Sequence, residues 1–237
     1  MRMDAKQQIP HHQEHHSTGS DFIKDIVIGM SDGLTVPFAL AAGLSGAVQT
    51  TGIIVLAGLA EITAGSIAMG LGGYLAGKTE TDFYESELRR EYEEVDALPD
   101  EEKLEVKAFF QELGLSEDIQ EKAVQEITKD REKWVDFMMK YELNLEKPDP
   151  KRARNSALNI GISYIVGGLV PLSPYFFIEV PSKAFPVSVV VTLVCLFIFG
   201  FFKSKVTGVN PWGGALRVTL IGAAAAAAAF FVAKLFR

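Results

Sequence analysis

Cysteine is nearly absent from this sequence. Cys195 is the only one among 237 residues, and it lies in an apolar run. A single cysteine excludes an intrachain disulfide and any zinc or iron–sulfur site built from cysteines. Histidine is confined to a polar tail that carries His11, His12, His15 and His16. This cluster could bind metal weakly, although its composition favours a tail without fixed structure.

Basic charge is also scarce. The formal net charge is −7, and no basic stripe is present to neutralise phosphates, which excludes nucleic acid as a partner. The charge is concentrated in the 77 residues 78–154, which hold 23 of the 30 acids and 14 of the 23 bases, a net −9. A single soluble domain mixes charged and apolar residues throughout. The pattern therefore predicts a membrane protein with one acidic soluble insert.

Outside the insert, five apolar stretches reach the length of about 20 residues that a membrane-spanning helix needs. They are 26–48, 53–77, 157–178, 184–202 and 215–236. The sequence therefore predicts an all-α membrane protein with five transmembrane helices. Its predicted parts are a cytoplasmic tail 1–25, spans 1 and 2 in 26–77, the insert 78–154, and spans 3 to 5 in 155–237.

Lysine and arginine near the span ends predict the orientation, because cytoplasmic loops carry the excess of these residues. With the N-terminus in the cytoplasm, the tail, the insert and the link 203–217 hold 20 of the 23 bases on that side. No secretory signal peptide is recognisable, so the first span must direct insertion. Five spans then place the C-terminus on the opposite, lumenal side.

The insert reads as three helices. The first, 80–95, continues from the second span without a Gly or Pro break. Pro99 is placed to open the second helix, and Gly114 to end it. Ser116 is a candidate N-cap for the third, whose apolar residues repeat at helical spacing as far as 145.

Two acids and a methionine inside the spans are candidates for function. Asp32 lies in the first span and Glu61 near the centre of the second. A carboxylate within a bilayer is costly and usually faces a water path or a partner. Met69 follows Glu61 at i+8 on roughly the same helix side, and a sulfur beside a carboxylate favours later transition metals. Packing remains the common role of such a methionine.

The insert presents acids at helical spacing, with a Met-Met pair beside one of them. Three predicted helices could bring these side chains together around metal ions, and a solvated acidic surface is the simpler alternative. The candidates are Glu91, Glu94, Glu102, Glu105, Met138, Met139 and Glu142, with Glu87 on the same face as the first two.

Three stretches, 25–46, 61–70 and 167–176, resemble the vacuolar iron transporter family, close to its plant members. The tail pattern at 12–16 is similar too, and the resemblance covers essentially the whole chain. It implies a homodimer in the vacuolar membrane that moves Fe²⁺ from cytosol to vacuole in exchange for protons and often accepts Mn²⁺. It also implies that Asp32, Glu61 and Met69 lie along the transport pathway. In the insert, it implies a metal site made of Glu91, Glu94, Glu102, Glu105, Met138, Met139 and Glu142.

The family implies no prosthetic group, with Fe²⁺ as substrate, and no enzyme activity. A di-iron ferroxidase is the alternative enzyme, but its Glu-x-x-His pairs need histidines, and all four lie at or before residue 16. A passive divalent-metal channel would need the same acids without proton coupling. The residues do not separate a channel from an antiporter; the family resemblance favours the antiporter.

Overall fold

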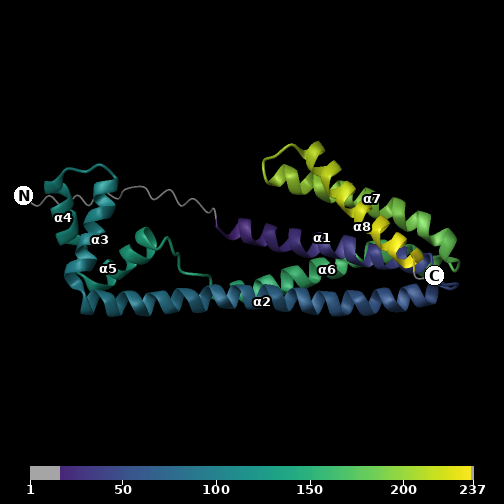
Figure 1. Cartoon of the computed structure of the whole chain (residues 1–237), viewed down its shortest axis with the longest axis horizontal. Helices are drawn as coiled ribbons and strands as arrows, with labels where there is room; N and C mark the ends of the chain where they lie inside the picture. Colours follow the sequence, from purple (N-terminus) through teal and green to yellow (C-terminus); the bar gives the residue numbers. More distant parts are fainter. Residues whose placement is uncertain (1–16, 236–237) are drawn as a thin grey trace, which may run out of the picture. The chain divides into compact units, whose positions relative to one another are not determined.

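The computed structural model describes residues 17–235, which are helical with no strand among them (Figure 1). The tail histidines lie outside the described residues. The elements are α1 Ser17–Ser45, α2 Thr51–Ala97, α3 Pro99–Glu112, α4 Glu117–Ile127, α5 Arg131–Phe137, the π-helix η1 Met138–Glu142, α6 Arg152–Phe177, α7 Pro181–Val206 and α8 Pro211–Leu235.

Five of these helices, α1, α2, α6, α7 and α8, are long and apolar enough to cross a membrane. The predictions of an all-α chain and of five spans are therefore confirmed. The described residues divide into two compact units, one of residues 17–71 and 155–235 (the membrane unit) and one of residues 72–154 (the insert unit). The long helix predicted to leave the second span is also confirmed, since α2 runs unbroken over 47 residues.

In the membrane unit, α1 packs against α7 and α8, and small residues allow the contact. Phe38 and Ala42 of α1 form one buried cluster with Ala226 of α8. Ala226 lies in a run of seven successive alanines, 223–229, whose short side chains let a helix approach a neighbour closely. A second buried cluster, which includes Ile54, Ile62 and further residues of α1, α6 and α7, lies around α2.

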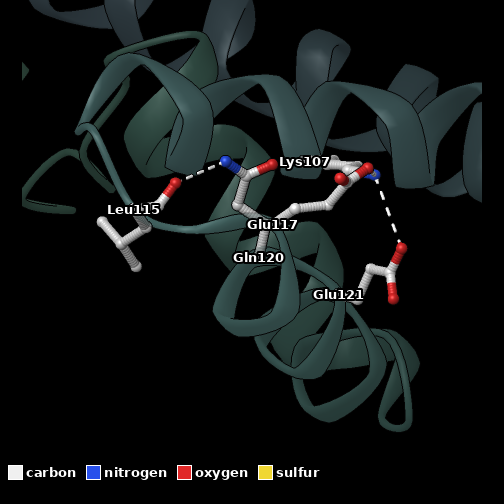
Figure 2. A network of polar contacts seen from close by, with 5 residues as sticks. All are labelled: Lys107, Leu115, Glu117, Gln120 and Glu121. Atoms are coloured by element: carbon white, nitrogen blue, oxygen red, sulfur yellow. Dashed lines mark hydrogen bonds and ion pairs between the residues drawn. The ribbon is translucent and has the colours of Figure 1, made fainter.

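In the insert unit, α3 and α4 are joined by a turn that the sequence specifies. Pro99 is the first residue of α3, where its missing N–H costs no helical hydrogen bond. Gly114 has φ +78°, the left-handed conformation that favours glycine after a helix. Gln120 then donates from Nε2 to the carbonyl oxygen of Leu115 at 2.6 Å, and Lys107 of α3 pairs with Glu117 at 3.3 Å (Figure 2).

The prediction of a single third helix in the insert is wrong. The chain leaves the helix after Ile127, and α5 begins at Arg131. Asp130 causes the restart, because its side chain accepts hydrogen bonds from the backbone N–H groups of Glu132 and Lys133 at 3.1 and 3.4 Å. Tyr141 interrupts the predicted apolar stripe, since it is 49% exposed, whereas Leu145 at the end of the stripe packs against the core.

Candidate metal-binding sites

Glu61 lies on α2 in the membrane unit, against the side chain of Tyr164 from α6. The Tyr164 hydroxyl donates a hydrogen bond to Glu61 Oε1. The other carboxylate oxygen, Oε2, is buried and has no hydrogen-bond partner among the described residues. A buried oxygen without a donor is costly, and such exceptions call for a ligand, an ion or water to explain them.

Glycines allow the three helices to meet at this point. A Cβ added to Gly65 of α2 would lie 2.4 Å from the Tyr164 hydroxyl oxygen, and one added to Gly33 of α1 would lie 2.4 Å from the Tyr164 carbonyl oxygen. A Cβ at Gly29 would lie 2.3 Å from the carbonyl oxygen of Ile160. Real Cβ atoms do not approach so closely. The glycines are therefore what lets α6 lie directly on α1 and α2.

Asp32 belongs to the same neighbourhood as Glu61. Its side chain is half-buried, and the carboxylates of Asp32 and Glu61 both interact electrostatically with Tyr164. Met69 is half-buried two turns beyond Glu61 on α2. The structure thus brings Asp32 and Glu61 around one tyrosine, and it leaves Met69 further along the helix that carries Glu61.

Two prolines add backbone oxygens to this region. Pro37 and Pro171 have no N–H, so the carbonyl groups of Gly33 and Gly167 lose their i+4 helical donors. The two glycines also lie against each other, since a Cβ at Gly167 would be 3.1 Å from the carbonyl carbon of Gly33. Carbonyls freed within membrane helices are tolerated where they line a cavity or coordinate an ion.

Asp25, the first residue of the stretch 25–46, is a buried acid that was not predicted as a site residue. It is 1% exposed and accepts hydrogen bonds from Ser156 Oγ at 3.0 Å and Asn159 Nδ2 at 3.4 Å. Its spacing of seven from Asp32 places both acids on one face of α1. This spacing could have singled out Asp25 from the sequence. Its hydrogen-bond partners Ser156 and Asn159 on α6 could not be predicted, because they depend on how the helices pack.

The insert unit brings together acids and sulfurs from three elements. Glu91 of α2 is 2% exposed, Glu102 of α3 is 5% exposed, and Met138 and Met139 of the π-helix are both buried. Oxygen Oε2 of Glu91 and Oε2 of Glu102 are buried without a hydrogen-bond partner in the part of the chain that the structure describes. Three helical segments therefore bring together carboxylate oxygens that lack a hydrogen-bond partner and buried thioether sulfurs.

The electrostatics of these two buried acids are strongly perturbed. Burial, together with the neighbouring charges of Glu142 and Glu94, raises the pKa of Glu91 to about 7, against an opposing effect of Arg90. Burial likewise raises the pKa of Glu102 to about 7, with Glu105 as the main neighbouring charge. Burial disfavours the charged form, so each group gains and loses its proton near neutral pH, where a cation can take the place of that proton.

The outer acids of the cluster are more accessible. Glu105 and Glu142 have exposed side chains. Desolvation by the surrounding protein raises the pKa of Glu142, and so do the neighbouring charges of Glu105 and Glu94 and a hydrogen bond to Glu105. Glu94 is half-buried and pairs with Arg90 at 3.4 Å, and Arg90 also pairs with Glu87 at 3.0 Å. Arg90 therefore neutralises part of the acidic face, which the sequence pattern did not indicate.

The two adjacent methionines are the first two residues of the π-helix η1, and both are buried. Leu143 N–H bonds to the carbonyl of Met138, an i+5 bond, at 3.1 Å. Sequence spacing did not predict this turn. Within residues 17–235, no three acidic, histidine or cysteine side chains are close enough to hold one ion as they stand.

These features define a class: a helical membrane protein with buried acids in its spans and a separate carboxylate–thioether cluster. A model of the VIT family matches residues 23–234, and the chain belongs to that family. A vacuolar iron transporter of Centaurea cyanus is 55% identical over 223 residues, which cover 94% of this chain and 91% of that relative. Vacuolar iron transporter 1 of Arabidopsis thaliana is 50% identical over 226 residues, with 95% and 90% covered.

Protein CCC1 of Saccharomyces cerevisiae is a more distant relative, 37% identical over 221 residues that cover 90% of this chain and 68% of its own length. The VIT family consists of transporters and not enzymes. The predicted resemblance and the prediction that the protein is no enzyme are therefore confirmed.

Proposed function

We propose that this protein moves Fe²⁺, and also Mn²⁺ and related divalent ions, from the cytosol into the vacuole in exchange for protons. The observation that carries the proposal is the buried, unpartnered Oε2 of Glu61 beside Asp32 in the membrane unit. Relatives named vacuolar iron transporter support iron as the substrate and the vacuolar membrane as the location.

The exchange follows from what a buried carboxylate can bind. Glu61 holds either a proton or a metal ion, and the two compete for the same oxygens. On the cytosolic side a metal ion displaces the proton. On the acidic vacuolar side protons displace the metal. Asp32, Met69 and the carbonyls of Gly33 and Gly167 provide further donors along the same route.

The insert unit acts as a collector at the cytosolic mouth. Glu91 and Glu102 exchange a proton for a metal near neutral pH because the pKa of each is about 7. Met138 and Met139 add soft sulfur ligands, which favour later transition metals over Ca²⁺ and Mg²⁺. Glu94, Glu105 and Glu142 form the accessible rim that attracts cations.

The working protein is a homodimer with the N-terminus and the insert on the cytosolic side and the C-terminus in the lumen. Small residues support the dimer, because Ala60, Ala64 and Ala68 form a stripe on α2 that is exposed in the single chain. The distribution of lysine and arginine supports the orientation.

Transport by variants in lipid vesicles tests the two roles separately. Joint replacement of Glu102 and Glu105 by Ala is expected to slow uptake at low Fe²⁺ and to spare part of it at saturating Fe²⁺. Glu61→Gln is expected to abolish uptake at every concentration. Complete loss of transport in a folded Glu102→Ala, Glu105→Ala double variant would show that the insert does more than concentrate ions.

A further inference from the structure

Tyr164 holds a position that the transport route described above does not explain. Its side chain is 2% exposed, and its hydroxyl is the donor that reaches Glu61 Oε1. The ring lies over Gly65, one helical turn beyond Glu61 on α2. A tyrosine that fills ordinary core space needs no glycine beneath its hydroxyl. The hydroxyl group of Tyr164 instead packs directly against α2, the helix that carries Glu61.

The hydrogen bond makes the two oxygens of Glu61 unequal. Oε1 accepts from Tyr164, whereas Oε2 is buried with no partner among the described residues. A partial rotation of the carboxylate would break the bond to Tyr164 and leave a buried hydroxyl without an acceptor, which is unfavourable, and a half turn only exchanges two equivalent oxygens. The tyrosine therefore fixes the direction in which the free oxygen points.

We propose that Tyr164 is a positioning and specificity-determining residue, which occupies Oε1 so that the transported ion binds Glu61 through Oε2 alone. The proposal rests on the proposed function, in which Glu61 binds the ion. Gly65 and Gly33 contribute to this positioning, because the absence of a Cβ leaves space for the ring of Tyr164 at Gly65 and for its backbone at Gly33.

Binding through one oxygen discriminates between cations. Ca²⁺ takes 6–8 oxygen ligands and commonly uses both oxygens of a carboxylate. Smaller transition-metal ions take fewer ligands and accept a single carboxylate oxygen alongside a thioether. A tyrosine that keeps Oε1 engaged therefore disfavours Ca²⁺ more than Fe²⁺, at a site that both ions would otherwise enter.

Tyr164→Phe tests this, because it removes only the hydroxyl. Tyr175→Phe is the matched control, since Tyr175 is also a buried tyrosine of α6 and its hydroxyl is 2.8 Å from Ser45 Oγ, not from an acid. Both variants are reconstituted in lipid vesicles. The apparent KM for Fe²⁺ and the inhibition of Fe²⁺ uptake by Ca²⁺ are measured for each.

We expect Tyr164→Phe to raise the apparent KM for Fe²⁺ about tenfold, the effect of one hydrogen bond to a charged group. We also expect Ca²⁺ to inhibit this variant at about tenfold lower concentration relative to Fe²⁺. Tyr175→Phe is expected to leave the Ca²⁺-to-Fe²⁺ ratio unchanged. Equal ratios in the two variants would overturn the proposal.

Glu61→Gln separates this proposal from the proposed function. If Glu61→Gln transports normally, Glu61 is not on the route and the proposed function fails with it. If Glu61→Gln is inactive and Tyr164→Phe behaves like Tyr175→Phe, the route stands and only the positioning role fails. Binding of Co²⁺ to the insert, followed by Trp134 fluorescence, should be the same in every variant and shows that the insert unit of each is folded.

Discussion

Replacing Glu102 by Gln is expected to stabilise the metal-free insert unit at high pH while it weakens metal binding. Glu102 is 5% exposed, its Oε2 has no hydrogen-bond partner among the described residues, and burial raises its pKa from 4.5 to about 7. The folded state therefore binds this proton more tightly than the unfolded chain does. The stability from this group is present at low pH and is lost as the pH rises from about 4.5 through 7.

The size of the effect follows from that shift in pKa. A shift of one pKa unit corresponds to about 1.36 kcal/mol. Ionisation of Glu102 therefore lowers the free energy of unfolding by about 3 kcal/mol at pH 8 and by less than about 1 kcal/mol at pH 5. Glutamine cannot ionise, so Glu102→Gln removes about 2.5 kcal/mol of this pH dependence. The new amide N–H group costs about 1–3 kcal/mol at both pH values if it finds no acceptor, which leaves the difference between them unchanged.

Urea unfolding of the metal-free, detergent-solubilised chain measures this difference at pH 5 and pH 8. Trp134 is buried in the core of the insert unit and reports its unfolding, and Trp212→Phe removes the signal of the exposed second tryptophan. Glu101→Gln is the control, because Glu101 is exposed on the same helix. If Glu102→Gln shifts the unfolding free energy equally at both pH values, the inference from its burial is refuted.

Three further predictions concern other parts of the protein. Gly65→Ala is expected to reduce Fe²⁺ transport at least tenfold, because its Cβ would lie 2.4 Å from the Tyr164 hydroxyl oxygen. Gly72→Ala is the control and should transport normally, because a Cβ there has nothing within 4 Å. Equal transport by the two variants in vesicles would contradict this prediction. Met69→Leu keeps the volume and removes the sulfur, so it should lower Fe²⁺ transport more than Mn²⁺ transport in the same vesicles, and an equal loss would exclude a sulfur ligand. Fe²⁺ binding at pH 6.5 should release protons from Glu91, because the pKa of this group is about 7. Anaerobic calorimetry in two buffers of different ionisation enthalpy detects the released protons as a difference in the measured heat. Identical heats in the two buffers would argue against proton displacement.

The sequence predicted those parts of the fold that depend on local chemistry. Five spans follow from the length of the apolar runs, and the start of α3 and its end follow from Pro99 and from Gly114 at φ +78°. The break between α4 and α5 was missed because the apolar spacing continues through it. There, a local hydrogen-bond acceptor, Asp130, outweighs the periodic pattern.

The candidate site was predictable in its residue types but not in its contacts. An acid within a span is unusual enough to single out Asp32 and Glu61 from sequence. Tyr164 was not singled out, because a tyrosine in a span is ordinary until packing places its hydroxyl on Glu61. The same holds for Asp25, whose partners Ser156 and Asn159 lie more than 130 residues away in the chain.

The most direct test of the central claim is simultaneous measurement of Fe²⁺ uptake and internal pH in vesicles with an acidic interior. The account predicts that the wild-type protein moves Fe²⁺ inward against its gradient while the interior becomes less acidic, and that Glu61→Gln does neither although its insert still binds metal. Fe²⁺ flux without proton movement would contradict the exchange, and so would Fe²⁺ uptake against its gradient by Glu61→Gln.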